Sequence, residues 1–346
     1  MQIKDFGTTK DGVATHLYTL DNGNMQVDLT DFGAAIVAIR VPDRDGKTVD
    51  VTLGHDNVTG YEENGGYLGA VIGRSANRIG LAKALVDGKE YAMTVNDNDN
   101  NLHNAPNGID HQVFKAVPSG SNYITFTIFS PHMHQELPGN MVIAVIYELT
   151  ADNALKLTYR ALSDETTLAN FTNHVYFNLN GQGTGNIEDH TLKLYASAYT
   201  PVADHQAIPT GRIMDVTDTV FDFRIPKKIG RDINADEQQL KFVGGYDHNF
   251  AVDGAIGCLR PAACAVGEKS GITMETWTDL PGIQLYAGNF ITDGMPGKGG
   301  ATYHPRSGFC LETQYFPNAI NQPGFVKPEF GAGKLIESNT VYKFFG

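Results

Sequence analysis

The chain has few of the residues that would cross-link it or carry it into a membrane. Its 346 residues include only three cysteines, too few and too widely spaced for a disulfide framework or a thiolate metal site. No apolar run reaches the roughly 18 residues of a membrane-spanning helix. The segment Met1 to Lys10 carries Lys4, Asp5 and Lys10 and no signal-like apolar run. We therefore expect a cytosolic protein with reduced thiols.

Positive charge is also scarce. The chain has 26 lysines and arginines against 39 aspartates and glutamates, which gives a formal net charge of -13. Nucleic acids and anionic membranes are bound by clustered lysine and arginine, so this balance argues against both as partners. A neutral small molecule fits better. The composition says nothing about oligomeric state.

Several motifs of nucleotide, hydrolase and metal chemistry are missing. The glycine-rich run Gly297 to Gly300 contains Lys298 but lacks the spacing and the hydroxyl residue of a phosphate-binding loop. No Gly-x-Ser-x-Gly sequence marks a nucleophilic serine. His132 and His134 have no third ligand at a recognisable spacing, so an exposed loop is the better interpretation. We expect no cofactor and no metal.

Strand-like runs recur from end to end of the chain. Glycine (38) and proline (15) supply many turns between them, and no low-complexity linker or fixed-period repeat divides the chain. The best helical candidate is short, Ile233 to Leu240. The predicted strands are Val27–Thr30, Ala35–Val41, Tyr123–Phe129, Met141–Leu149, Leu155–Ala161, His190–Tyr195, Ile272–Trp277 and Ile283–Tyr286. This pattern predicts an all-β fold, a large antiparallel β-sandwich formed by a single domain of residues 1–346.

The run Asn170 to Leu179 combines strand-forming aromatics with amide and hydroxyl side chains around one histidine. In an extended backbone His174 shares a face with Tyr176 and Asn178, and that face resembles the wall of a polar pocket. The alternative is a core histidine whose ring is hydrogen-bonded by neighbouring amides. For a single histidine in a strand, that alternative is the commoner case.

The same run, Asn-x-Thr-Asn-His-x-Tyr-Phe-Asn-Leu, resembles a signature of the galactose mutarotases, or aldose 1-epimerases. Five more blocks resemble that family, in family order, and the likeness covers almost the whole chain: Val71–Ile79, Asn101–His103, Gly245–Phe250, Pro281–Phe290 and Ser307–Gln314. The resemblance implies a β-supersandwich with an open sugar-binding cleft. It also implies an isomerase that interconverts the α and β anomers of galactose or glucose, free aldohexoses, without a cofactor.

Ring opening of an aldose needs a base for the proton of the C1 hydroxyl and an acid for the ring oxygen. The resemblance implies Glu312 as the base and His174 as the acid. Glu312 lies in an apolar run, where a carboxylate is costly to bury unless it faces a polar cleft. Work at neutral pH predicts that the folded site raises the pKa of His174 or uses a minor protonated fraction. The resemblance implies the substrate-binding residues Asn77, Arg78, His103, Asp247 and Gln284.

Some positions keep alternatives open. Arg78 and Asp247 would also suit a structural salt bridge. His103 is followed by Asn104 and Ala105, where the family usually has two glycines, so the geometry of that loop is an open question. His248 should point away from Asp247 in an extended segment, which favours a structural role.

Three other functions are alternatives to the epimerase. A glycoside hydrolase needs two carboxylates at the scissile bond, whereas the acid implied here is a histidine. A non-catalytic sugar-binding module would be expected to lack the acid or the base. A hexose-6-phosphate epimerase would need extra cationic groups for the phosphate. The sequence does not decide between galactose and glucose.

Overall fold

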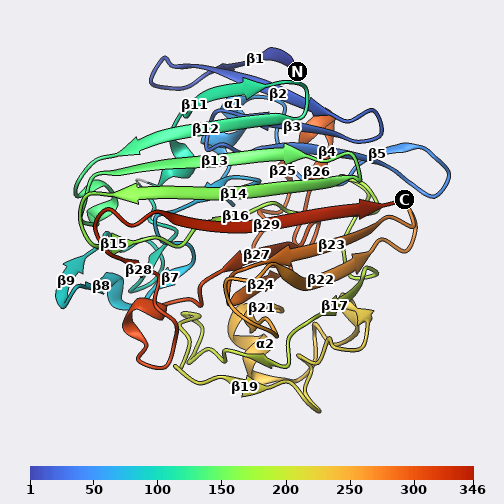
Figure 1. Ribbon diagram of the computed structural model, residues 1–346. Coiled ribbons are helices and arrows are strands. Elements are labelled where there is room, and N and C mark those ends of the chain that lie inside the picture. Colours follow the sequence, from blue (N-terminus) through green and yellow to red (C-terminus); the bar gives the residue numbers. More distant parts are fainter. Residues whose placement is uncertain (107) are drawn as a thin grey trace.

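A nine-stranded antiparallel sheet forms one side of the molecule (Figure 1). The structure is a computed structural model that describes residues 1–106 and 108–346. In spatial order the strands are β11 (Lys115–Ser119), β12 (Tyr123–Ser130), β13 (Met141–Leu149), β14 (Ala154–Ser163), β29 (Ile336–Phe345), β23 (Thr273–Thr278), β22 (Arg260–Val266), β17 (Thr191–Leu194) and β20 (Lys227–Lys228). Along β13 fully buried side chains alternate with more exposed ones, so one face of the sheet points into the core.

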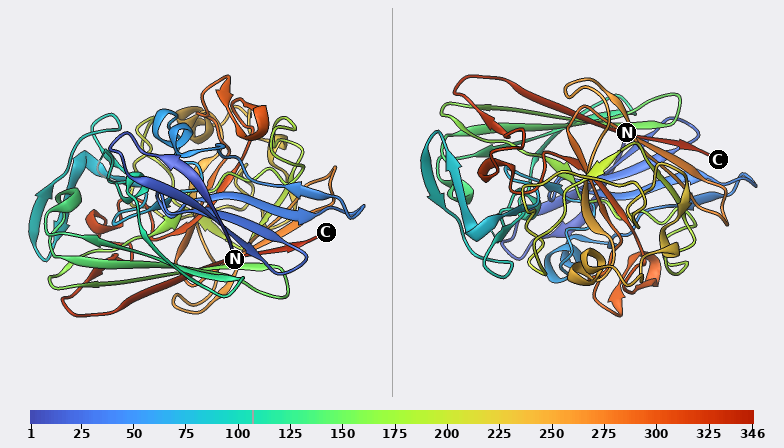
Figure 2. Two further views of the ribbon diagram at one scale, coloured as in Figure 1. Left: turned by 90° about the horizontal axis from the view of Figure 1, so that it is seen from above. Right: turned by 90° about the horizontal axis from the view of Figure 1, so that it is seen from below.

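Two five-stranded sheets pack behind this face. The N-terminal sheet contains β1 (Gln2–Thr8), β2 (Ala14–Asp21), β3 (Gln26–Thr30), β4 (Ile36–Pro42) and β5 (Thr48–Asp50) in sequence order. The inner sheet has the order β19 (Met214–Asp215), β18 (Ala198–Tyr199), β21 (Asp247–Ala251), β24 (Gly282–Tyr286) and β27 (Cys310–Gln314). Seen from above and below, the green and red strands of the large sheet lie on one side, opposite orange and light-blue segments (Figure 2).

Short elements complete the fold. Two-stranded pairs are formed by β6 (Val71–Ile72) with β16 (Thr172–Asn173), β7 (Arg78–Ile79) with β10 (Asn101–Leu102), β8 (Lys83–Val86) with β9 (Lys89–Ala92), β15 (Thr167–Leu168) with β28 (Glu329–Phe330), and β25 (Met295–Pro296) with β26 (Thr302–Tyr303). The α-helices are α1 (Val58–Glu63) and α2 (Gln238–Val243). Neither they nor any other helix in the described ranges is long and apolar enough to cross a bilayer.

The core joins the large sheet to the inner sheet. Tyr342 on β29 is fully buried, its ring centroid lies 5.0 Å from that of Phe177, and its hydroxyl donates to the carbonyl of Leu311 at 3.3 Å. Leu311 lies on β27, the inner strand that also carries Glu312. One hydrophobic cluster, whose members lie between Tyr18 and Phe344 in the sequence, includes Tyr342, Phe177 and Leu311. The strand that carries Glu312 is therefore fixed from behind by the main core.

The predicted all-β class and the eight predicted strands are confirmed, with ends that shift by up to two residues. The predicted helix from residue 233 to 240 is wrong in its extent, because α2 begins at Gln238. The side chain of Glu237 caps the helix by accepting from the Gln239 N–H, and Gly244 ends it in the left-handed conformation at φ 69°. The capping residue and the terminal glycine set these bounds rather than the apolar spacing.

Candidate active site

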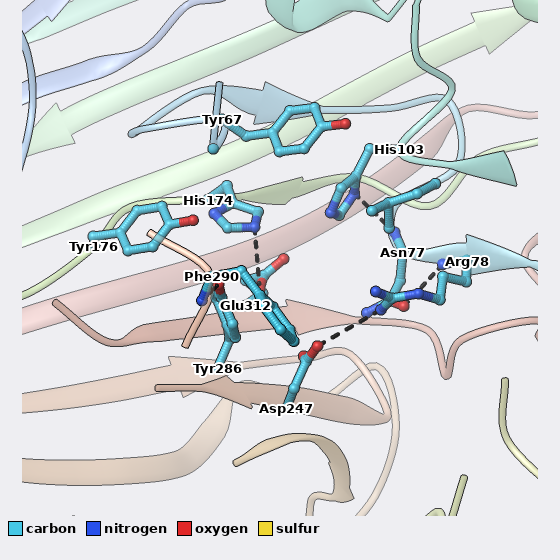
Figure 3. Close-up of a pocket in the computed structure, with 12 residues that line it drawn as sticks. Tyr67, Asn77, Arg78, His103, His174, Tyr176, Asp247, Tyr286, Phe290 and Glu312 are labelled. Atoms are coloured by element: carbon cyan, nitrogen blue, oxygen red, sulfur yellow. Dashed lines mark hydrogen bonds and ion pairs between the residues drawn. The ribbon is translucent and has the colours of Figure 1, made fainter. Parts of the chain in front are cut away.

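A cavity of about 170 Å³ lies over the inner sheet and collects side chains from distant parts of the chain (Figure 3). Its lining residues are Gly66, Tyr67, Asn77, Arg78, Leu102, His103, His174, Tyr176, Asp247, Tyr286, Phe290 and Glu312. Six of the seven site residues predicted from the sequence are in this set. The seventh, Gln284, is not.

Glu312 is held at the floor of the cavity by β27. All five residues of this strand are buried, and Glu312 lies opposite Gln284 on β24. Its side chain is 3% exposed, and Oε2 has no hydrogen-bond partner among the described residues. Burial and the negative charge of Asp247 raise the pKa of Glu312 well above its usual value, and Arg78 opposes this shift. The expected carboxylate in an apolar strand does face a polar cavity.

His174 follows the short strand β16, and its Nε2 lies 3.7 Å from Oε1 of Glu312. This distance is too long for a hydrogen bond, and both groups line the cavity. Burial lowers the pKa of His174 to about 4. Of the two expectations for this residue, a raised pKa is therefore wrong, and work through a minor protonated fraction stays a prediction. The physical reason is that desolvation of the imidazolium outweighs the backbone hydrogen bond that favours it. Burial therefore disfavours the charged form of both groups.

Cys310 supports the histidine from behind, a contact that the sequence motif did not reveal. Its Sγ lies 3.6 Å from Nδ1 of His174. Burial, with the charges of Glu312 and Asp247, raises the pKa of the thiol well above its usual value, so it stays protonated at neutral pH. Because Nδ1 is occupied by this contact, Nε2 is the ring atom presented to Glu312.

His103 is held in one tautomer by the backbone. Its Nδ1 accepts a hydrogen bond from the Asn77 N–H at 3.1 Å, so the hydrogen of the neutral ring is on Nε2. Burial lowers the pKa of His103 well below its usual value, which keeps the ring neutral. One ligand atom from each of His103, His174 and Glu312 lies within 4.8 Å of the others, as in a metal site. A metal would need the Nε2 lone pair, which this tautomer lacks, so His103 fits a hydrogen-bond donor better than a ligand.

The loop after His103 shows how the chain accommodates the two missing glycines. His103 and Asn104 both adopt the left-handed region, each with φ 59°. Asparagine tolerates this region better than most residues with a Cβ. The Asn104 side chain also accepts a hydrogen bond from the Ser75 N–H at 2.5 Å. Asn104 can therefore take the place of glycine without displacing His103 from the cavity.

Arg78 and Asp247 form the salt bridge that the structural interpretation predicts, and both side chains also line the cavity. Nη1 of Arg78 lies 3.7 Å from Oδ2 of Asp247, while Nε donates to Asp97 at 2.7 Å. Asp97 was not predicted from the sequence, since it lies in a loop without a recognised motif. Gln284 lies behind this pair, where its Nε2 donates to Oδ1 of Asp247 at 2.7 Å. In this structure Gln284 orients Asp247 rather than facing the cavity.

Aromatic rings make up the rest of the wall, and most of them were not predicted. Tyr67 packs with its ring centroid 4.8 Å from that of His103 and 5.7 Å from that of His174. Tyr176 lines the cavity next to His174, as the strand pattern predicted. Asn178 does not, because its amide donates to the carbonyls of Gly185 and Ser307. Aromatic walls with a few fixed polar groups are typical of small-molecule sites.

His248 lies outside the cavity. It is buried with its ring centroid 4.7 Å from that of Phe221, whereas its neighbour Asp247 lines the cavity. Strand β21 therefore turns the two side chains to opposite faces, as its extended backbone predicted.

An all-β sandwich whose cleft holds a buried carboxylate–imidazole pair, an arginine, a second carboxylate and aromatic walls is typical of an enzyme that acts on sugars. Comparison with known proteins is more specific. The family "Aldose 1-epimerase" matches residues 16–343. The chain is 40% identical to galactose mutarotase from Bos taurus over 98% of this chain and 97% of that protein. It is 35% identical to aldose 1-epimerase from Escherichia coli K12, with 96% of each chain covered.

Solved structures agree with this result. A crystal structure of an aldose epimerase homologue from C. elegans superposes with a TM-score of 0.87 at 30% identity, covering 96% of this chain and 99% of that one. A galactose 1-epimerase from Lactobacillus acidophilus gives a TM-score of 0.85 at 28% identity, over 99% and 98% of the two chains. The chain belongs to the aldose 1-epimerase family and has the galactose mutarotase-like fold.

Proposed function

We propose that this protein is a mutarotase that interconverts the α and β anomers of a free aldohexose, galactose or glucose, by opening and reclosing the ring. The observation that carries the proposal is the pair of Glu312 and His174, 3.7 Å apart and facing one sugar-sized cavity. Family membership supports the same reaction. The chemistry requires one group to take a proton from the C1 hydroxyl and another to protonate the ring oxygen.

In the proposed relay Glu312 is the base and His174 the acid, as the family resemblance implies. The pair needs only one proton between its members, because opening moves a proton from C1–OH to one group and from the other group to the ring oxygen. The directions of the two pKa shifts favour Glu312 as the carrier of that proton when the cavity is empty. Sugar binding then has to shift this proton to His174 before the ring opens. Ring closure on the other face of the aldehyde reverses both transfers.

The remaining residues are proposed to hold the sugar. Arg78 and His103 offer donors, Asp247 accepts from hydroxyl groups, and Asn77 contributes an amide. Gln284 would act through Asp247, given the 2.7 Å hydrogen bond between them. The aromatic rings cover the apolar faces of the sugar ring. No step of this scheme uses a metal or an organic cofactor.

Polarimetry on freshly dissolved α-galactose and α-glucose tests the proposal. With the protein present, the rotation should reach its equilibrium value far faster than in buffer alone. An unchanged rate for both sugars would refute a mutarotase. Incubation with chromogenic glycosides is the companion test, since sustained release of the aglycone would indicate a glycoside hydrolase instead.

We further propose that the chain acts as a single domain of residues 1–346 and works in the cytosol. The family match over residues 16–343 and the continuous hydrophobic cluster support one domain. The three cysteines, all of them free in the described part of the chain, are compatible with a reducing compartment.

A further inference from the structure

Tyr67 separates the catalytic cavity from a second cavity of about 430 Å³, and it lines both together with Gly66. The second cavity is open to water at its edge, because the exposed Gly65 and the half-exposed ring of His111 also line it. On the other side of Tyr67, the His174 side chain is only 6% exposed, and its ring centroid lies 5.7 Å from that of Tyr67. The Tyr67 ring therefore lies between a hydrated space and the proposed acid of the relay.

Backbone hydrogen bonds fix Tyr67 relative to His174. The Gly69 N–H donates to the carbonyl of His174 at 3.0 Å, and the His174 N–H donates to the carbonyl of Ala70 at 2.9 Å. The Ala70 N–H donates to the carbonyl of Tyr67 at 3.0 Å. Two hydrogen bonds therefore join the turn that carries Tyr67 to His174 itself, and a third holds this turn closed.

Tyr67 has a backbone conformation that is uncommon for an aromatic residue. Its φ of 58° lies in the left-handed region, which asparagine and histidine adopt more readily than bulky residues do. Such a conformation persists where the surrounding contacts hold it. The Tyr67 ring lies 4.8 Å from that of His103, and the His103 and His174 rings lie 5.3 Å apart. One aromatic ring thus packs against both imidazoles of the cavity (Figure 3).

Titratable groups face His174 from several elements, and Tyr67 differs from most of them in carrying no proton of the relay. Burial raises the pKa of the Tyr67 hydroxyl, so this group stays neutral. Its effect on His174 is therefore through access of water and not through charge. The other groups that face the His174 ring are Glu312 and Cys310 from β27, Tyr286 from β24, Tyr176 from the segment after β16 and His103 from the segment after β10.

We propose that Tyr67 is a positioning residue that holds the imidazoles of His103 and His174 and keeps the water of the second cavity away from them. The proposal rests on the mutarotase function and adds to it a residue that acts through His174. Without the ring the two cavities would become one, and water would reach the side of the imidazole that Tyr67 covers. Hydration stabilises the imidazolium, so the pKa of His174 would rise from about 4 toward its ordinary value.

The chain offers substitutions that separate the ring from the backbone. Tyr67→Gly removes the ring, and glycine suits the left-handed conformation, so the substitution adds no strain. Tyr67→Phe keeps the ring and loses only the hydroxyl. Leu81→Gly is the matched control, because Leu81 also has a left-handed backbone (φ 54°), is exposed and lines neither cavity.

The experiment measures kcat/KM for mutarotation against pH and titrates His174 by NMR in the free protein. In Tyr67→Gly, the fall of kcat/KM at acid pH and the titration of His174 should move together to higher pH by about one unit. At neutral pH kcat should fall about tenfold or more, with a smaller change in KM, because the imidazoles are no longer held in place. Tyr67→Phe and Leu81→Gly should keep the acid limb and the His174 titration of the wild type.

An unmoved acid limb and an unmoved His174 titration in Tyr67→Gly would overturn the proposal, and a change in KM alone would mean that Tyr67 only contacts the sugar. Equal shifts in Tyr67→Phe and Tyr67→Gly would assign the effect to the hydroxyl and not to the ring. If Tyr67→Gly fails to fold, Tyr67→Asn decides, since asparagine tolerates the left-handed region and lacks the ring. If the wild type mutarotates no sugar, the mutarotase function fails, and the NMR titrations still test whether Tyr67 shields His174.

Discussion

The pKa shifts of Glu312 and His174 are opposite in direction but have the same largest cause, since burial disfavours the charged form of each group. The resemblance to known sequences pointed to these two residues because both lie in recognisable motifs. It did not reveal Cys310, Asp97 or Tyr67 as parts of the site. Their roles arise from contacts between segments that are far apart in the chain, and no local pattern records such contacts.

We predict that Glu312→Gln and His174→Asn each lower mutarotation by about 10² to 10⁴ fold, because each removes one end of the proton relay. Both substitutions nearly preserve side-chain shape, so the melting temperature should change little. Polarimetric rates beside melting curves check this. His132→Asn is the control, since His132 is half exposed, pairs with Glu165 and does not line the cavity. A variant that kept more than a tenth of the wild-type rate would show that its residue has another role.

Cys310 allows a finer test of how the His174 ring is held. Cys310→Ala removes the 3.6 Å contact to Nδ1 and should reduce kcat more than it raises KM, because the ring loses its orientation. Cys310→Ser keeps a hydrogen-bonding group of smaller size and should recover part of the lost rate. Steady-state kinetics of both variants provide the measurement. Equal rates for alanine and serine would mean that Cys310 only fills space.

At the scale of elements, the long strands were predictable and the short ones were not. β13 was predicted with both its ends, because a nine-residue run rich in β-branched residues directly follows the turn residues Pro138, Gly139 and Asn140. The two-residue strands β7, β10 and β16, which place Arg78, His103 and His174, are too short to have a period. Their positions depend on pairing with partners elsewhere in the chain. The segments that carry most of the site were therefore predicted from sequence motifs and not from secondary-structure patterns.

The loop after β10 gives a prediction about stability. Asn104→Gly loses the hydrogen bond to the Ser75 N–H but suits the left-handed backbone, whereas Asn104→Ala loses the bond and also strains the backbone. The alanine variant should be less stable than the glycine variant by about 1 kcal/mol. Urea unfolding of both proteins measures the difference. An alanine variant at least as stable as the glycine variant would contradict the backbone argument.

At the scale of the whole molecule, the sequence indicated an all-β sandwich but not its strand order. β29, the last strand, lies in the middle of the large sheet between β14 and β23. Such pairing over long sequence distances is fixed by tertiary packing, which periodicity does not encode. The site depends on this order, since Tyr342 of β29 supports the strand that carries Glu312.

This dependence can be measured with two aromatic residues of the same strand. Tyr342 is fully buried, whereas Phe345 is 44% exposed at the strand end. We predict that Tyr342→Ala lowers the free energy of unfolding by about 3 to 5 kcal/mol through the cavity it leaves. Phe345→Ala should cost less than about 1 kcal/mol. Urea unfolding gives both values, and similar losses would mean that β29 does not join the two sheets as described.

The central claim is that Glu312 and His174 share one proton, and the pH dependence of kcat/KM tests it most directly when His174 is titrated by NMR in parallel. Only near pH 4 should His174 become protonated while Glu312 is also protonated, so that the pair carries two protons. Activity should fall on this acid side. The pair should lose its last proton at a pH well above the usual pKa of a glutamate. Activity should fall on this alkaline side. The account predicts a broad bell with a plateau through neutral pH and an acid limb that coincides with protonation of the His174 ring. A His174 ring that titrates on the alkaline limb, or a profile without limbs from about pH 4 to pH 9, would contradict it.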